Sequence, residues 1–211
     1  MKPLHEQAPK LRLFHLRESL IKIHLDLFKI NAKVHGSLDF PRSGLTELEK
    51  MCLVLEDRRF FDHHGIDVWS AARETLRALT FRRHGGASTI DMQFVRTCTG
   101  YRELTLGRKV YEMLLAVLIQ FRYSKIAILR SYLNCAYFGA QPRGASSAAQ
   151  MEFGKRVSEL SLDESAFVAA MLISPRPRSP TSQWRLRVQR RADYGKSVYL
   201  RNKQRFDQMP R

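Results

Sequence analysis

The sequence of 211 residues has few cysteines, no long hydrophobic run and fewer acidic than basic side chains. Cys52, Cys98 and Cys135 are odd in number and lack CxxC spacing, which argues against a disulfide framework or a zinc site. No apolar run approaches the roughly 20 residues of a membrane-spanning helix, and residues 1–19 have no hydrophobic signal core. We therefore expect neither a transmembrane nor a signal segment.

The charge imbalance predicts an anionic partner. Lys and Arg number 36 against 20 Asp and Glu, so the formal net charge is +16. Such an excess suits nucleic acid, lipid headgroups or a phosphorylated substrate. No zinc finger, basic zipper or RNA-binding aromatic motif is present, so we expect no nucleic-acid partner.

Helical periodicity runs through most of the chain and predicts an all-α fold. Apolar residues recur at helical spacing across residues 11–30, with basic residues between them, as in an amphipathic helix lying on a surface. Residues 35–44 have the composition of a loop. We expect two further helices over residues 106–122 and 124–138.

Two capping boxes and a set of prolines predict where helices begin and where regular structure ends. Thr46-x-x-Glu49 and Ser161-x-x-Glu164 have the spacing at which each side chain satisfies the other residue's backbone amide. Beyond Pro175 the prolines are expected to end regular structure. The many arginines that follow favour a basic tail.

The segment LEDRRFFDHHGID begins at Leu55 and sets carboxylates beside arginines and histidines. If a helix runs to Phe60, Glu56 has Cys52 one turn before it and Phe60 one turn after. Apolar neighbours make a carboxylate more basic, while Arg59 favours its ionised form, and this combination suits a general base. The alternative is an ordinary ion pair at a helix end.

The same segment contains His63 and His64, but no third ligand falls at a spacing typical of zinc sites. We therefore expect no metal site here. A second interpretation is that the His63 side chain holds the loop by a hydrogen bond while Gly65 turns the chain.

Two further segments have anion-binding features. Arg108, Lys109 and Glu112 lie in RKVYE, where two cations could hold a phosphate or pyrophosphate and Glu112 could pair with Arg108. RRHGGAS is a glycine-containing loop whose Ser88, with the following Thr89, could bind phosphate oxygens at a helix N-terminus, although no Walker motif is present. A solvated helix start is the alternative for RKVYE.

Taken in order, EDRRFFDHHG, GASTIDMQ, RKVYE, and YSKIAIL running into YLNCAYFG resemble the motif series of the family 51 glycosyltransferases. These are the peptidoglycan glycosyltransferases of bifunctional penicillin-binding proteins and of monofunctional biosynthetic transglycosylases. The resemblance covers residues 45–175 and includes FGK at Lys155. Because no transpeptidase domain fits in the remainder, we expect the monofunctional type.

The resemblance implies a mainly helical, lysozyme-like lobe with a small membrane-facing jaw subdomain. We divide the chain accordingly into an amphipathic N-terminal segment and loop (residues 1–44), a glycosyltransferase domain (residues 45–180) and a basic C-terminal tail (residues 181–211).

The resemblance also implies the activity. Members of the family polymerise lipid II into β-1,4 glycan strands with inversion and release undecaprenyl pyrophosphate. On this basis Glu56 removes a proton from the 4-hydroxyl of the acceptor, and cations stabilise the pyrophosphate that leaves. No cofactor is required, although a divalent ion such as Mg or Mn is compatible with the site.

The matching positions divide into three groups by the role that the resemblance implies. The catalytic acids are Glu56 and Glu112, of which the second orients the cations or a divalent ion. The residues that bind substrate or pyrophosphate are Ser88, Thr89, Gln93, Arg96, Arg108, Lys109 and Lys155. The residues that support the motifs are Asp57, Phe60, His63, Gly65 and Asn134.

The sequence departs from the family pattern at several positions. Where the second motif usually reads STITQQ or STISQQ, Asp91 replaces a hydroxyl and Met92 replaces an amide. The acid commonly found before YSK is Gln120, and the acidic pair after its lysine is absent. If Asp91 pointed into the site, its charge would weaken pyrophosphate binding.

The expected partners are lipid II, the growing glycan strand, an anionic membrane surface and other cell-wall synthesis proteins. We expect a peripheral position on the outer face of the cytoplasmic membrane, held by the amphipathic start and the basic tail. Two alternatives stay open: a lysozyme-like enzyme that cleaves glycan, and a catalytically impaired paralogue that binds lipid II or glycan.

Overall fold

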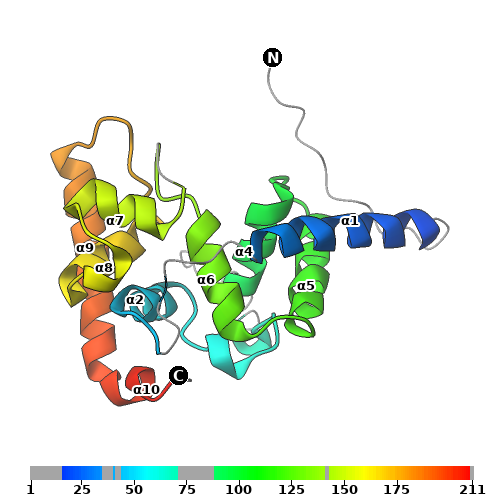
Figure 1. Cartoon of the computed structure of the whole chain (residues 1–211), viewed down its shortest axis with the longest axis horizontal. Coiled ribbons are helices and arrows are strands. Elements are labelled where there is room, and N and C mark those ends of the chain that lie inside the picture. The colour runs from blue at the N-terminus through cyan, green and yellow to red at the C-terminus, as the bar shows by residue number, and fades with distance from the viewer. Residues whose placement is uncertain (1–15, 35–39, 41–43, 71–87, 141–142, 210–211) are drawn as a thin grey trace, which may run out of the picture. The chain divides into compact units, whose positions relative to one another are not determined.

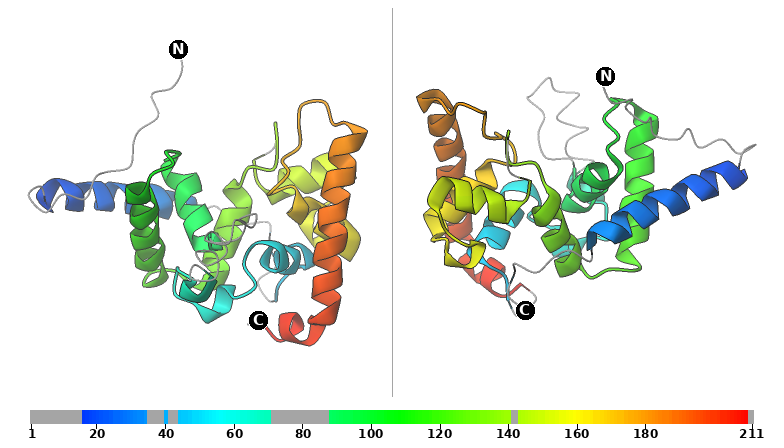
Figure 2. Two further views of the ribbon diagram at one scale, coloured as in Figure 1. Left: turned by 180° about the vertical axis from the view of Figure 1, so that it is seen from behind. Right: turned by 45° about the horizontal axis from the view of Figure 1, so that its top comes forward.

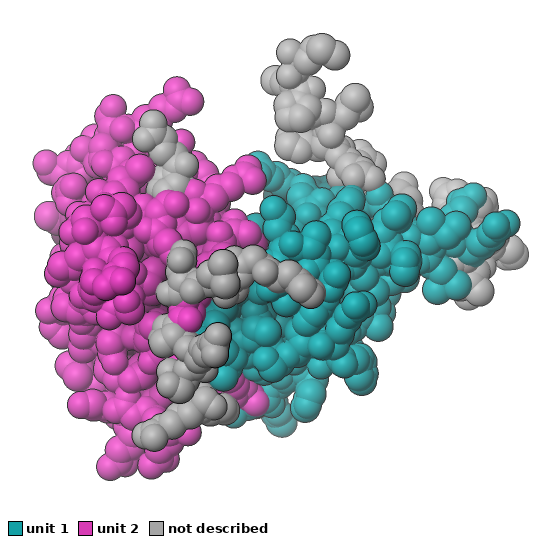
Figure 3. Space-filling model, viewed as in Figure 1, with its two compact units in different colours: residues 1–36, 62–132 teal, residues 37–61, 133–211 magenta. Residues whose placement is uncertain are grey.

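The computed structural model describes residues 16–34, 40, 44–70, 88–140 and 143–209 (Figure 1). The chain forms two compact units, coloured separately in Figure 3. Unit 1 comprises Met1–Gly36 and Asp62–Tyr132, and unit 2 comprises Ser37–Phe61 and Leu133–Arg211. The loop RRHGGAS, apart from its final Ser88, and the interpretation of residues 35–44 as a loop fall mostly outside the described residues.

The described residues form helices and no strand, so the predicted all-α fold is confirmed. The α-helices are α1 (Leu16–Val34), α2 (Glu47–Glu56), α4 (Ile90–Thr99), α5 (Leu106–Gln120), α6 (Lys125–Cys135), α7 (Ala145–Phe153), α8 (Leu162–Ala170), α9 (Ser182–Arg201) and α10 (Lys203–Asp207). Two 3₁₀ helices are η2 (Phe60–Asp62) and η3 (Val157–Glu159). Among the described residues, no helix is both long and apolar enough to cross a membrane.

Unit 1 is built from α1, α4 and α5, which pack against one another. Tyr101 and Tyr111 are fully buried, and both hydroxyls donate to the Asp26 carboxylate on α1, at 2.8 and 2.9 Å. The amphipathic helix predicted over residues 11–30 is present as α1, which extends four residues further to Val34. Residues 11–15 are outside the described part.

Unit 2 is built around α2, α8 and α9. Both predicted capping boxes are confirmed, at Thr46 before α2 and at Ser161 before α8. Phe167 of α8 meets Trp184 of α9 edge to face, and the Trp184 indole donates to the Ser174 carbonyl at 3.0 Å. These contacts bring the end of the chain onto the central helix α8.

The prediction that regular structure ends at the prolines is wrong. Figure 2 shows α9, coloured orange, as one long helix followed by the short α10. Trp184, Val188, Ala192 and Val198 recur at helical spacing and are buried, while the residues between them include four arginines. Residues 182–207 therefore belong to unit 2, because an apolar stripe runs through the basic sequence and packs on α2 and α8.

The long helices end slightly before their predicted ends. α5 ends at Gln120, and α6 ends at Cys135, where the expected stop was at Gly139. After Cys135 the chain forms two isolated β-bridges, one between Tyr137 and Arg143 and one between Gly139 and Arg176. Tertiary pairing therefore replaces the last turn that the helical period predicts.

Candidate active site

Glu56 is the last residue of α2 and is half-buried. One turn earlier Cys52 is fully buried, and the pKa of its thiol is raised, first by burial and then by the negative charges of Glu56 and Glu49. The Glu56 carboxylate therefore lies close enough to the buried Cys52 thiol to raise its pKa. This agrees with the apolar environment predicted one turn before Glu56.

Helix α2 ends earlier than predicted because side chains donate hydrogen bonds to backbone carbonyls that would otherwise accept from the next helical turn. The Arg58 Nε donates to the Val54 carbonyl at 3.1 Å, and an Arg191 guanidinium nitrogen of α9 donates to the Leu55 carbonyl at 2.9 Å. In a continuing helix these carbonyls would accept from the next turn of backbone amides. Phe60 consequently lies in η2 and not on the helix of Glu56.

Helix α9 approaches the end of α2 at a glycine. A Cβ added at Gly195 would lie 2.8 Å from a Leu55 methyl carbon, so a larger residue would force the Leu55 side chain to shift. Arg58 also donates to the Tyr194 hydroxyl at 2.8 Å. Arg191 and Gly195 thus support the position of Glu56, and neither was among the predicted site residues because their segment was predicted to be a basic tail.

Gly65 makes the turn predicted after the histidines. Its φ is 86°, and an added Cβ would lie 2.4 Å from the Ala116 carbonyl oxygen of α5. The Thr89 hydroxyl donates to the Gly65 carbonyl at 2.7 Å and accepts from the Met92 amide at 3.2 Å as the N-cap of α4. Thr89 is buried, so its hydroxyl ties this turn to the start of α4.

A cluster of charged side chains lies where α4 meets the start of α5. Glu112 is fully buried and accepts two hydrogen bonds from the Arg96 guanidinium, at 2.9 and 3.0 Å. The Arg108 guanidinium donates to the same carboxylate, as predicted from its spacing. The hydrogen bonds to Glu112 raise the pKa of Arg96. Glu112 therefore holds two guanidinium groups in fixed positions.

Lys109 adds a third cation to this cluster. Its amino group donates to the Ser88 hydroxyl at 2.9 Å. Burial lowers the pKa of Lys109, Glu112 opposes this effect, and Arg96 and Arg108 lower the pKa further. Three cations surround one acid, so an anionic group such as a phosphate would relieve the repulsion among them.

The remaining predicted residues are more dispersed. The Tyr132 hydroxyl donates to the Gln93 side-chain carbonyl at 2.6 Å. Lys155 pairs with Glu164 at 2.7 Å and lines a hollow of about 750 Å³ together with Ser146. Asn134 is half-buried near the end of α6. The predicted residues of unit 2 are Glu56, Asp57, Phe60, Asn134 and Lys155, and all the others belong to unit 1.

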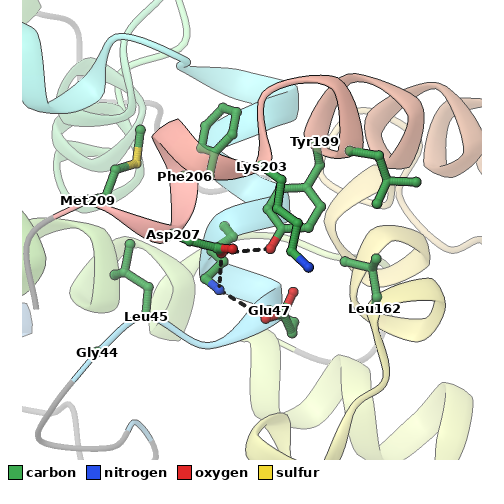
Figure 4. A pocket seen from close by; sticks show the side chains of 11 residues that line it. Gly44, Leu45, Glu47, Leu162, Tyr199, Lys203, Phe206, Asp207 and Met209 are labelled. Carbon is green, nitrogen blue, oxygen red and sulfur yellow. Dashed lines mark hydrogen bonds and ion pairs between the residues drawn. The ribbon is translucent and has the colours of Figure 1, made fainter.

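A second hollow, of about 560 Å³, lies in unit 2 beside α10 (Figure 4). Lys50 pairs there with Asp207 at 2.9 Å, and the Tyr199 hydroxyl donates to the same carboxylate at 2.9 Å. None of the predicted site residues lines this hollow. Lys50 pairs with both Glu47 and Asp207, so these charged groups secure α10 to α2.

The family model described as transglycosylase matches residues 42–198. The chain therefore belongs to the transglycosylase family of glycosyltransferases, and the family predicted from the motifs is confirmed. The matched range includes most of α9, which agrees with the packing of that helix on α2 and α8.

The chain is similar to part of penicillin-binding protein 1A from several bacteria. It is 36% identical to the protein of Rickettsia bellii over 153 residues, which cover 71% of this chain and 19% of that protein. The identity to the Escherichia coli protein is 40% over 136 residues, covering 64% of this chain and 16% of the relative. The chain spans about a fifth of the length of the relatives it matches.

Proposed function

We propose that this chain polymerises lipid II into β-1,4 glycan strands. The Glu56 carboxylate accepts the proton of the acceptor's 4-hydroxyl, and the freed oxygen attacks the anomeric carbon of the growing chain. The bond from that carbon to the pyrophosphate oxygen breaks, its electron pair leaves with undecaprenyl pyrophosphate, and the configuration inverts. Membership of the transglycosylase family supports the reaction class.

The observation that carries the proposal is the cation cluster around Glu112. Guanidinium groups bind phosphate oxygens through two hydrogen bonds, and Lys109 contributes a compact charge. Preorganised cations lower the barrier when negative charge develops on the leaving group. Arg96 is the most exposed of the cations paired with Glu112, at 36% of its side-chain area, and so presents charge to a ligand.

The same cluster favours a polymerase over a lysozyme-like hydrolase. A hydrolase must protonate a sugar oxygen, which needs a neutral acid and no group of cations. Because three cations are already in place, we also propose that Mg or Mn is not required. Polymerisation should therefore persist after treatment with a chelator.

The test is polymerisation of labelled lipid II in detergent by the purified chain. Glu56→Gln should abolish strand formation, because the amide cannot accept the proton, while its melting temperature stays near that of the wild type. Glu47→Gln, on the same helix, is the matched control and should retain activity. Cleavage of preformed strands without use of lipid II would contradict the proposal and favour the hydrolase.

We also propose a peripheral position on an anionic membrane surface. Arg187 and Arg190 are exposed on α9. A basic residue near such a surface contributes about 1 kcal/mol, or about a fivefold change in affinity. This location suits an enzyme whose substrate is a lipid.

Substitution, not truncation, should test the membrane proposal, because α9 packs on α2 and α8. Arg187→Gln with Arg190→Gln should weaken binding to phosphatidylglycerol vesicles by about 25-fold at low salt. Binding to neutral vesicles should not change. Equal binding of the variant and the wild type to anionic vesicles would contradict this part of the proposal.

A further inference from the structure

Asp91 lies in the first turn of α4 and is fully buried. Its carboxylate accepts a hydrogen bond from the Gln120 side-chain amide and pairs with the Lys125 amino group at 3.0 Å. Gln120 is the last residue of α5 and Lys125 the first residue of α6. One buried carboxylate therefore joins the start of α4, the end of α5 and the start of α6.

The segment from His63 to Gly65 contacts the same charged side chains and the start of α4. The Lys125 amino group lies 3.4 Å from the His63 Nδ1. Two residues later, the Gly65 carbonyl accepts from the Thr89 hydroxyl at the N-cap of α4. The neighbouring residue is Ser88, whose hydroxyl accepts from Lys109. A shift of the first turn of α4 would therefore move the partner of Lys109.

The contact between Asp91 and Gln120 also accounts for two departures from the motif pattern, at positions 91 and 120, as one linked change. In the sequences that this chain resembles, position 91 carries a hydroxyl and position 120 an acid. Here the acid stands at Asp91 and the uncharged side chain at Gln120, and these two side chains are hydrogen-bonded. The exchange keeps one acid beside Lys125. Asp91 is paired within unit 1, so the expected weakening of pyrophosphate binding by its charge does not follow.

We propose that Asp91 is a positioning residue, which, with Gln120 and Lys125, holds the start of α4 so that Ser88 stays against Lys109. A buried ion pair needs both partners, because removing one leaves an uncompensated charge. The exchange of acid and uncharged side chain between positions 91 and 120 is therefore a coupled substitution. Its catalytic consequence rests on the proposed function, whereas its structural consequence does not.

The experiment is a double-mutant cycle with Asp91→Thr, Gln120→Glu and the two combined. Asp91→Thr leaves Lys125 without this acid, and Gln120→Glu places two acids beside it. Each single variant should lower the melting temperature and reduce kcat on lipid II about tenfold, with KM within about twofold. The double variant, with one acid again beside Lys125, should recover most of both losses.

A second measurement does not depend on activity. Reductive methylation of the Lys109 amine, followed by mass spectrometry, should be at least about threefold faster in Asp91→Thr, because Ser88 no longer holds that amine. The double variant should return to the wild-type rate. Asp193→Thr removes an exposed acid from α9 and is the matched control, for which no change is expected.

The outcomes separate this inference from the proposed function. Additive losses in the double variant, or an Asp91→Thr variant with unchanged melting temperature and Lys109 reactivity, would overturn it. Recovery of the melting temperature without recovery of Lys109 reactivity would overturn the positioning role. A wild type that does not use lipid II would refute the proposed function, while the cycle in melting temperature and Lys109 reactivity would still decide the inference.

Discussion

Unit 1 contains two fully buried carboxylates in different electrostatic surroundings. Asp91 pairs with Lys125, whose side chain is 15% exposed, accepts from the uncharged Gln120 amide of α5, and lies 4.0 Å from the His63 Nδ1. Glu112 has two guanidinium partners and a third cation, Lys109, close by. Three cations lie close to the single carboxylate of Glu112, whereas Asp91 is bonded by Lys125 and an uncharged amide.

This comparison separates a structural ion pair from a binding site by charge balance and exposure. Both carboxylates are inaccessible, so burial alone does not distinguish them. The surplus charge around Glu112 is unfavourable without an anion and becomes favourable when one binds. The Asp91 carboxylate is bonded to Gln120 of α5 and Lys125 of α6, which fits a role in holding helices together.

Within this comparison of buried carboxylates, the largest expected effect comes from neutralising Glu112. Glu112→Gln removes the charge that orients Arg96 and Arg108, so kcat should fall by about 100- to 1000-fold. Kinetics on lipid II measure this change. Glu159→Gln, at an exposed ion pair, is the matched control and should stay near wild-type activity. A Glu112→Gln variant within threefold of the wild type would show that the cluster does not serve the leaving group.

A smaller effect is expected from the pH dependence of Lys109. Its protonated form stabilises the pyrophosphate, so activity should fall as the pH rises through a pKa that burial has lowered below the usual range of lysine. Lys109→Arg should lower kcat about tenfold at neutral pH, because arginine has a different shape, and should abolish this alkaline decline. Profiles of kcat/KM against pH test it. An identical alkaline decline in the variant would assign it to another group.

The smallest effect is expected at a third carboxylate, which is exposed. Hydrogen bonds from Lys50 and Tyr199 lower the pKa of Asp207, so its contribution to stability is present above its unfolded pKa and is lost as the pH falls through the lowered pKa. Asp207→Asn should reduce the free energy of unfolding by less than about 1 kcal/mol near neutral pH, and by still less in acid. Urea unfolding at both pH values measures this. A larger loss would place α10 among the main supports of unit 2.

Local sequence patterns predicted many of the helices and several contacts of the candidate site. The capping boxes at Thr46 and Ser161 and the Arg108–Glu112 pair depend on spacings of three or four residues, which helix geometry converts directly into contacts. The end of α2 was predicted less well, because Arg191 is far away in the sequence and takes the Leu55 carbonyl.

The misreading of α9 has a similar cause. Five of its 20 residues are arginines, and its buried positions include Ala192 and Gly195, which add little to a hydrophobic pattern. A reading at helical spacing from Trp184 through Val188 could have found the stripe. Only the packing decided which helices this apolar stripe covers and that α9 supports the end of α2 at Glu56.

The sequence by itself determined the helical class, the helix starts at the two capping boxes and the order of charged motifs that identifies the family, because these features are encoded within single turns or in linear spacing. Only the tertiary structure decided that Asp91 pairs with Lys125 and Gln120, that Arg96 joins Arg108 on Glu112, and that Gly195 meets Leu55. These contacts join separate helices, and their existence depends on how side chains fill a shared interior.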